Sequence, residues 1–166
     1  MIVVVMGVSG SGKTTLGRLL AARLACEFVD ADDHHPTENV AKMAAGVPLE
    51  DADRWPWLDA LNALLRAHAD RGASVVLACS ALKQAYRDRL CAGIGDCRLV
   101  YLKGTLEQIR SRLAARRHRY MPASLLDSQF AALEPPLDAI TVEVAEPPER
   151  CIERVLSALR SAPPRP

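Results

Sequence analysis

The chain alternates short apolar runs with longer segments in which apolar residues recur at helical spacing. The runs, most of them rich in β-branched residues, predict buried strands over 2–6, 27–29, 74–79, 98–102 and 140–144. The segments between them predict helices that start after residue 12 and near residues 36, 54, 84, 105, 122 and 147. Strands that alternate with helices are typical of an α/β fold, here a five-stranded parallel sheet with helices on both faces.

Local capping signals refine two of these helices. An acidic turn precedes residue 54, so Asp51 or Asp53 is expected to cap the helix that follows. The apolar stripe of that helix predicts a core-facing side, formed by Trp57, Leu58, Leu61, Leu64 and Leu65. Farther along, Thr105 and Gln108 form a T-x-x-Q capping box, which predicts the start of another helix.

Residues 7–14, GVSGSGKT, fit the pattern G-x-x-x-x-G-K-[ST] and lie between a predicted strand and a predicted helix. Glycines let the backbone fold so that several N–H groups point at phosphate oxygens, and the helix adds the positive end of its dipole. Lys13 would neutralise charge between the β- and γ-phosphates, and the Thr14 hydroxyl would bind Mg²⁺. A glycine-rich turn with a solvated lysine is the alternative, and the flanking elements disfavour it. The predicted nucleotide-binding residues of this loop are Gly7, Val8, Ser9, Gly10, Ser11, Gly12, Lys13, Thr14 and Thr15.

Composition adds limits to this interpretation. A length of 166 residues suits one domain, 1–166, and 49% hydrophobic with 25% charged residues is ordinary for a globular protein. The net charge of +1 argues against a broad nucleic-acid surface. No apolar run reaches the roughly 20 residues that span a membrane, and the first strand does not resemble a signal peptide. We therefore expect a cytoplasmic enzyme with a loose proline-rich tail at 161–166.

Five cysteines occur, and none belongs to a C-x-x-C pair. They are Cys26, Cys79, Cys91, Cys97 and Cys151. An odd number cannot all pair, so we expect reduced thiols, as in cytosolic proteins. Their spacings do not support a metal site, which is the alternative.

An acidic and histidine-rich cluster, Asp30-Ala31-Asp32-Asp33-His34-His35-Pro36, directly follows the second predicted strand. Ligands of parallel α/β sheets bind at the carboxyl ends of the strands, so this cluster is predicted to contribute to the site. A solvated turn is the alternative, with Asp33 as a helix cap and His34 as a simple turn residue.

Two basic features also predict anion binding. Arg54 lies at a helix start, where a cation opposes the helix dipole; this favours an anion partner over a surface arginine. The second feature is a cluster of five arginines and one histidine: Arg110, Arg112, Arg116, Arg117, His118 and Arg119. We expect a mobile lid over about 115–127 that brings guanidinium groups to ATP phosphates. A solvated helix end is one alternative; nucleic-acid binding, with only Tyr120 for stacking, is another.

Segments outside the phosphate loop resemble those of one particular protein family, whereas the loop alone is common to many families. They are Asp30-Ala31-Asp32, His35-Pro36, Asn39, Lys42-Met43, Gly46-Val47-Pro48-Leu49, Asp53-Arg54, Pro56-Trp57-Leu58, Cys79-Ser80-Ala81-Leu82-Lys83, Tyr86-Arg87, Tyr101-Leu102-Lys103-Gly104, Gln129-Phe130 and Leu133-Glu134-Pro135. With the loop, they make nearly the whole chain resemble the gluconokinases of the small P-loop type, which are related in fold to shikimate and nucleoside monophosphate kinases. The H-P, D-R-x-P-W-L and C-S-A-L-K segments are the specific ones, since many families share the loop.

The resemblance implies a P-loop fold with an arginine-rich lid, and an enzyme that uses ATP and Mg²⁺ to phosphorylate D-gluconate on its terminal hydroxyl, giving 6-phospho-D-gluconate. The implied catalytic residues are Lys13, Asp32 and Arg116. Asp32 would orient or deprotonate the attacking hydroxyl, while Lys13 and Arg116 would stabilise charge on the transferred group. Thr14 and Asp30 would hold Mg²⁺, Asp30 through water. By the same resemblance, Arg112 and Pro147 would contact the nucleotide.

The acceptor is a linear polyol carboxylate, so it needs one anion site and several hydroxyl partners. The predicted substrate-binding residues are Asp32, His35, Lys42, Arg54, Lys83 and Arg87. Arg54, Arg87 and Lys83 are all available for the carboxylate, which arginine can bind through two parallel hydrogen bonds. Asp32 and His35 can hydrogen-bond hydroxyl groups.

Alternatives remain open at this point. The chain departs from the family at His118-Arg119-Tyr120, where gluconokinases often carry a Gly-His-Phe-like segment. Shikimate kinase usually has G-G-G where this chain has Ser80-Ala81-Leu82-Lys83, and an adenylate-type kinase would offer apolar room for a base. A nucleotide-binding regulator would not need the intact Lys13 and Asp32. Relatives are often homodimers, so the resemblance implies a homodimer. The near-neutral charge and the lack of a long apolar run predict neither a nucleic-acid nor a membrane partner.

Overall fold

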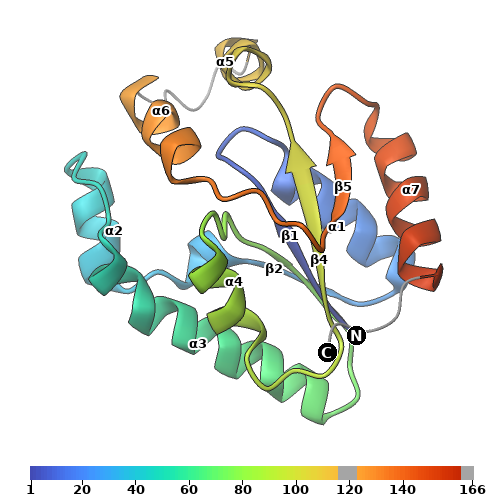
Figure 1. Ribbon diagram of the computed structural model, residues 1–166. Helices are drawn as coiled ribbons and strands as arrows, with labels where there is room; N and C mark the ends of the chain where they lie inside the picture. The colour runs from blue at the N-terminus through green and yellow to red at the C-terminus, as the bar shows by residue number, and fades with distance from the viewer. Residues whose placement is uncertain (116–122, 162–166) are drawn as a thin grey trace.

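Five parallel strands form one sheet at the centre of the molecule (Figure 1). The computed structural model describes residues 1–115 and 123–161. The strands are β1 (Ile2–Met6), β2 (Glu27–Asp30), β3 (Val75–Ala78), β4 (Cys97–Lys103) and β5 (Ile140–Glu143), in the order β2-β3-β1-β4-β5. Every neighbouring pair runs parallel, with Ile2 opposite both Val75 and Cys97. The predicted five-stranded parallel sheet is confirmed.

Helices cover both faces of this sheet. They are α1 (Lys13–Leu24), α2 (Thr37–Ala44), α3 (Asp51–Asp70), α4 (Gln84–Cys91), α5 (Leu106–Ala115), α6 (Ala123–Ala132) and α7 (Pro148–Ser161), with a short 3₁₀ helix at Ala31–His34. Alternate residues of β1 enter two separate cores, because successive side chains of a strand point to opposite faces. Val4 and Met6 pack with α3 and α4, whereas Val3 and Val5 pack with α1 and α7.

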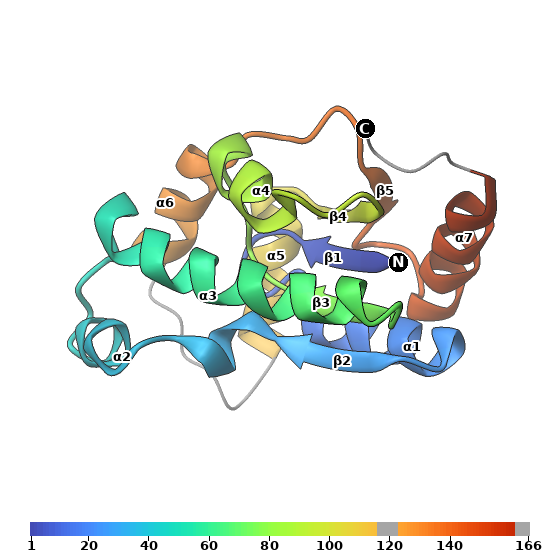
Figure 2. The ribbon, with the colours of Figure 1, turned by 90° about the horizontal axis from the view of Figure 1, so that it is seen from below.

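Because all five strands are parallel, their carboxyl ends lie at one edge of the sheet, which we call the functional edge because ligands of such sheets bind there. In Figures 1 and 2, α2 and the start of α3 extend beyond this edge on the β2–β3 side, and α5 and α6 lie beyond it as well. The loops that follow β1, β2 and β3 lie at this same edge. No helix within 1–115 and 123–161 is long and apolar enough to cross a lipid bilayer.

Helix boundaries differ from the prediction where side chains make the first hydrogen bonds. The helix predicted to start near residue 54 begins at Asp51, and its cap is Glu50 rather than Asp51 or Asp53. Glu50 and Asp53 form a reciprocal capping box, in which the Glu50 N–H donates to Asp53 Oδ2 at 3.0 Å. The box predicted at Thr105 and Gln108 is confirmed by two hydrogen bonds of 2.8 and 3.2 Å.

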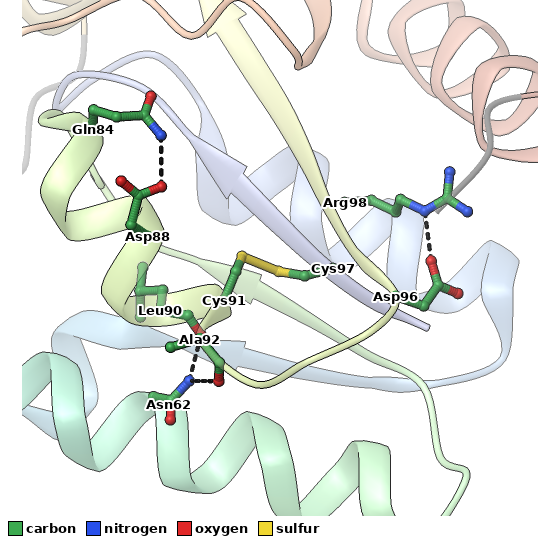
Figure 3. The surroundings of a disulfide bond; sticks show 9 residues. All are labelled: Asn62, Gln84, Asp88, Leu90, Cys91, Ala92, Asp96, Cys97 and Arg98. Carbon is green, nitrogen blue, oxygen red and sulfur yellow. Dashed lines mark hydrogen bonds and ion pairs between the residues drawn. A yellow bond between two sulfur atoms is a disulfide. The ribbon is translucent and has the colours of Figure 1, made fainter. Parts of the chain in front are cut away.

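The prediction of five reduced cysteines is wrong, because Cys91 and Cys97 form a disulfide (Figure 3). Cys91 ends α4 and Cys97 begins β4, and the intervening turn brings their Cα atoms to 5.8 Å, within the span of a disulfide. Asn62 of α3 supports the turn by donating to the carbonyls of Leu90 and Ala92. Cys26, Cys79 and Cys151 are free thiols.

Candidate active site

The loop after β1 folds back on itself and leads directly into α1. Its glycines permit this path, since Gly10 and Gly12 have φ angles of +84° and +106°, which side chains disfavour. Gly10 also lies against Leu113 of α5, where an added Cβ would come within 2.8 Å of a methyl carbon. Among the described residues, no side chain at the N-cap bonds to the backbone N–H groups at the start of α1, so they can bind an anion with the helix dipole behind them.

Lys13 and Thr14 lie at the mouth of this loop. The Lys13 ammonium donates to the Val8 carbonyl at 3.2 Å, so it folds back over the loop rather than into solvent. Burial lowers the pKa of Lys13 from its ordinary value, while the nearby charges of Asp32 and Asp30 act in the opposite direction. An ammonium that burial has deprived of water favours the arrival of a phosphate group, whose negative charge would stabilise it.

Thr14 and Asp30 come together although they lie on different elements. The Thr14 hydroxyl donates to Asp30 Oδ2 at 2.9 Å, and the other Asp30 oxygen accepts from the Asp32 N–H at 3.2 Å. Mg²⁺ in nucleotide sites keeps several waters and takes only one or two protein oxygens, so this pair suits it. No cluster of three or more acidic, cysteine or histidine ligands occurs in the part of the chain that the structure describes.

A cleft of about 360 Å³ opens beside the loop, between α1, α5 and the start of α7. Its walls include Gly12, Thr15, Arg112, Val144 and Pro148. The Arg112 guanidinium donates to the carbonyls of Ser11, at 3.3 Å, and Val144, so it joins α5 to both the phosphate loop and the end of β5. Pro148, rather than the predicted Pro147, lines this cleft; the Pro147 carbonyl instead accepts the first hydrogen bonds of α7.

On the other side of the loop, Asp32 and His35 lie next to α3. Asp32 belongs to the 3₁₀ helix after β2 and is exposed. His35 stacks on Trp57 with ring centroids 4.1 Å apart, and Trp57 itself donates to the Ala31 carbonyl at 3.0 Å. Burial lowers the pKa of His35, so its imidazole is neutral near pH 7. A neutral imidazole can both donate and accept hydrogen bonds, as polyol recognition requires.

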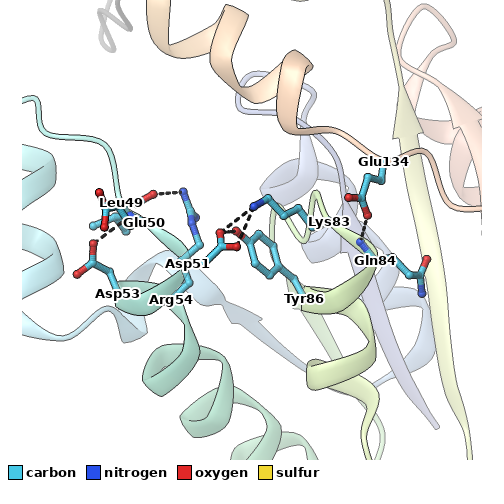
Figure 4. Close-up of polar contacts among 9 residues, drawn as sticks. All are labelled: Leu49, Glu50, Asp51, Asp53, Arg54, Lys83, Gln84, Tyr86 and Glu134. Carbon is cyan, nitrogen blue, oxygen red and sulfur yellow. Dashed lines mark hydrogen bonds and ion pairs between the residues drawn. The ribbon is translucent and has the colours of Figure 1, made fainter.

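Two of the predicted substrate-binding cations, Lys83 (Figure 4) and Lys42, are paired within the protein. The Lys83 ammonium contacts both oxygens of Asp51, at 2.8 and 2.9 Å, and the Tyr86 hydroxyl donates to the same carboxylate. These contacts hold the pKa of Asp51 below its usual range. Lys42 likewise forms an ion pair with Asp53 at 2.6 Å. Both cations therefore have their charge balanced by a carboxylate of α3.

Arg87 and Arg54, the two arginines predicted to bind the substrate, differ in burial and in hydrogen-bond partners. Arg87 is only 1% exposed, and its guanidinium donates to the carbonyls of Ala81 and Leu82 at 3.0 and 2.9 Å. It holds the loop between β3 and α4, at the carboxyl end of β3, and its predicted contact with the substrate stays a prediction. Arg54 donates only to the Leu49 carbonyl at 3.3 Å and lies over the Tyr86 ring, and within the described residues no carboxylate forms an ion pair with it.

Some predicted site residues lie outside the described ranges, and two contacts near the site were not predicted. Arg116 lies outside the described residues, as do Arg117, His118, Arg119 and Tyr120, so the predicted lid stays a prediction. Asp51 was expected only as a helix cap, yet it organises Lys83 and Tyr86. Gln129, which had no predicted role, contacts Ser9 of the phosphate loop. Neither contact has a local sequence signal, because each joins residues more than 30 positions apart.

A parallel α/β sheet with this loop after its central strand defines a P-loop domain of the kind that binds nucleoside triphosphates. Residues 2–136 match the family described as AAA domain. A probable gluconokinase of Xenopus tropicalis is 48% identical over 151 residues, which cover 82% of this chain and 80% of the relative. The thermosensitive gluconokinase of Escherichia coli K12 is 40% identical over 162 residues, covering 93% and 87%.

A solved structure agrees with these relatives. The crystal structure of a gluconokinase from Sinorhizobium meliloti 1021 matches with a TM-score of 0.87 at 40% identity, covering 96% of this chain and 91% of that one. Likeness at this level covers nearly the whole chain. The chain belongs to the gluconokinase family.

Proposed function

We propose that the protein transfers the γ-phosphoryl group of ATP to the terminal hydroxyl of D-gluconate, giving 6-phospho-D-gluconate and ADP. Membership of the gluconokinase family is the observation that carries this proposal, with identities of 40–48% to the relatives named above over most of the chain. The geometry supports it, because a phosphate-binding loop and a polar acceptor region meet at one edge of the sheet.

On the nucleotide side, the loop amides and Lys13 bind the β- and γ-phosphates, and Arg112 and the neighbourhood of Pro147 border the nucleotide cleft. Mg²⁺ neutralises phosphate charge when bound, and Thr14 and Asp30 are the residues that would hold it. Arg116 belongs to this proposal as a cation for the transferred group. Lys13 keeps its positive charge close to the leaving oxygen, which lowers the barrier to transfer.

On the acceptor side, Asp32 orients the attacking hydroxyl and accepts its proton, since it is exposed and its charge reaches Lys13. His35 hydrogen-bonds a second hydroxyl. Arg54 anchors the carboxylate of gluconate: Lys83 and Lys42 are already paired with carboxylates, and Arg87 is buried against carbonyls. Guanidinium binds a carboxylate through two parallel hydrogen bonds, which also fixes the direction of the substrate chain.

The three other predicted cations have indirect roles: they position neighbouring residues of the acceptor region. These cations are Lys83, Lys42 and Arg87. Lys83 and Tyr86 fix Asp51 at the start of α3, and Lys42 fixes Asp53, so the helix turn that carries Arg54 is held from both sides. Arg87 shapes the Ser80–Lys83 turn. We place the enzyme in the cytoplasm as a homodimer, without nucleic-acid or membrane partners, on the resemblance and on the near-neutral charge.

The experiment is ADP release from Mg²⁺-ATP with gluconate, shikimate, AMP or no acceptor in parallel. Stimulation by gluconate alone is the expected result. Stimulation by shikimate or AMP alone would keep the nucleotide site and overturn the acceptor assignment.

The variant Arg54→Ala tests the carboxylate anchor. Loss of gluconate saturation in this variant, with the KM for ATP within about threefold of the unmodified enzyme, would support Arg54 as the anchor, because removal of a charge-assisted contact costs about 1.5–3 kcal/mol.

A further inference from the structure

Gln129 of α6 makes two hydrogen bonds to one residue of the phosphate loop. The Ser9 N–H donates to Gln129 Oε1 at 2.7 Å, and Gln129 Nε2 donates to Ser9 Oγ at 3.0 Å. The two residues lie 120 positions apart, so only the fold brings them together. A side-chain amide bound to a backbone N–H and the adjacent hydroxyl fixes both the rotation and the position of that peptide unit.

The peptide that Gln129 binds is the same one that holds Lys13. Ser9 N–H and Val8 C=O belong to a single planar peptide unit, and that carbonyl accepts from the Lys13 ammonium at 3.2 Å. The two groups of a trans peptide point in opposite directions. When Gln129 holds the N–H on one side, the carbonyl must point at Lys13 on the other.

Gln129 can do this because α6 is firmly attached to the core. Leu126, one turn before Gln129, is 1% exposed, and Phe130, the next residue, packs against the core that β1 shares with α1 and α7. On α5, Arg112 binds the Ser11 carbonyl and Leu113 packs on Gly10. The helices on both sides of residues 116–122 therefore contact the phosphate loop directly.

We propose that Gln129 is a positioning residue for phosphoryl transfer: it fixes the Val8–Ser9 peptide so that Lys13 is aligned for the β- and γ-phosphates. Gln129 touches neither Lys13 nor the acceptor region among the contacts of the described residues, and it acts through the loop. This proposal rests on the proposed function for its kinetic readout, whereas its binding readout needs only the P-loop. Because Lys13 meets the γ-phosphate, a misaligned lysine weakens ATP more than ADP.

The test compares Gln129→Met with Ser128→Ala. Methionine keeps the length and the apolar stem but loses both hydrogen bonds. Ser128 is the neighbouring α6 residue; among the described residues, its exposed hydroxyl bonds only to the Leu125 carbonyl of its own helix, which makes it the matched control. We measure kcat, both KM values and, by calorimetry, the affinities for ADP and for a non-hydrolysable ATP analogue.

Gln129→Met is expected to lower kcat about tenfold, the size of two lost hydrogen bonds, with the KM for gluconate within about twofold. In Gln129→Met, the affinity for the ATP analogue falls by more than the affinity for ADP. In Ser128→Ala, kcat, both KM values and both affinities stay unchanged. Ser9→Ala keeps the N–H bond to Gln129 and loses only the hydroxyl, so its effect on kcat is smaller. Equal losses for both nucleotides, or an unchanged kcat in a folded Gln129→Met, would overturn the proposal. Absence of gluconate-dependent turnover in the unmodified enzyme would instead overturn the proposed function, and the two affinities would still test Gln129.

Discussion

Asp30 and Asp32 lie two positions apart, and their different surroundings suit the two carboxylates to different roles. Asp30 is held by the Thr14 hydroxyl and by the Asp32 N–H, so both of its oxygens have partners within the protein. Asp32 is exposed at the mouth of the loop, where its charge reaches Lys13. The first arrangement suits a fixed partner of Mg²⁺, and the second suits a group that meets an incoming hydroxyl.

Asp32→Ala should therefore remove turnover without removing the nucleotide. A general base contributes about 10²–10⁴ in rate, and kcat should fall by that range while affinity for Mg²⁺-ATP changes less than about threefold. Initial rates and calorimetry measure the two quantities. Asp33→Ala is the matched control, since Asp33 is an exposed neighbour on the same 3₁₀ helix, and its kcat should not change. A large loss of ATP affinity in Asp32→Ala would show that Asp32 serves the nucleotide instead.

His35 predicts a dependence of stability on pH. Burial lowers its pKa below the ordinary 6.5 in the folded protein; Asp32 opposes this shift and Arg54 adds to it. In the pH range between the lowered and the ordinary value, the unfolded chain binds more protons than the folded one. Stabilisation by neutral His35 is therefore fully present above about pH 6.5, and it is lost as the pH falls through the folded value.

Urea unfolding at pH 7.5 and pH 5 measures this dependence. The free energy of unfolding should be lower at pH 5, and His35→Gln, which cannot titrate, should show a smaller difference between the two pH values. An equal difference in both proteins would mean that other groups set the pH dependence and that His35 keeps its ordinary pKa.

Residue roles could be predicted where one local motif contains all the partners. The phosphate loop satisfies this, since Gly7 to Thr14 are contiguous and their chemistry follows from their spacing. The cations predicted to bind the acceptor lack such a motif. Lys83 forms an ion pair with a carboxylate 32 positions away, and Arg87 donates to a carbonyl of the loop that precedes its own helix. A basic residue near a site is a candidate ligand in the sequence, and only the fold shows which charges are already balanced.

At the scale of elements, hydrophobic periodicity predicted the five strands and seven α-helices of the described residues, with boundaries wrong by a few residues, but not the 3₁₀ helix at Ala31–His34. The helix α3 begins three residues before the predicted start, because Glu50 and Asp53 cap it together, whereas the prediction considered Asp51 or Asp53 alone as the cap. The disulfide has a similar explanation. A spacing of six positions carries no pairing signal, and the bond follows from a turn that places the end of α4 beside the start of β4.

This disulfide should stabilise the link between α4 and β4 without touching the reaction. Closing a short loop removes unfolded-state entropy worth about 2 kcal/mol, so Cys91→Ser with Cys97→Ser should lower the free energy of unfolding by about that amount. Dithiothreitol should lower the stability of the unmodified protein equally and leave the double variant unchanged. The KM for gluconate should stay within about twofold, since Lys83 and Tyr86 lie at the opposite end of α4 and are fixed by Asp51 of α3. A reductant that changes neither protein would contradict the bond.

At the scale of the whole molecule, the strand order β2-β3-β1-β4-β5 divides the functional edge in two. The loop after β1 lies in the middle, with the proposed nucleotide cleft toward β4 and β5 and the proposed acceptor residues toward β2 and β3. Both halves meet at the phosphate loop, where Lys13 faces the charges of Asp30 and Asp32. Two ligands can therefore bind side by side, and each should depend on its own half.

Thermal unfolding with single ligands tests this division. A ligand at about 100 times its Kd stabilises the folded state by about 2.7 kcal/mol, which raises the Tm of a protein of this size by about 5–10 °C. Mg²⁺-ADP should raise the Tm of Arg54→Ala as it does that of the unmodified protein, but should lose its effect on Lys13→Ala. Gluconate should show the reverse pattern, since its carboxylate anchor lies on α3 and not on the phosphate loop. Arg54→Lys keeps the charge but not the two parallel hydrogen bonds, so it should retain only part of the gluconate shift. If Arg54→Ala lost both shifts, the two halves would form one interdependent site, and the separation of nucleotide and acceptor residues proposed here would be wrong.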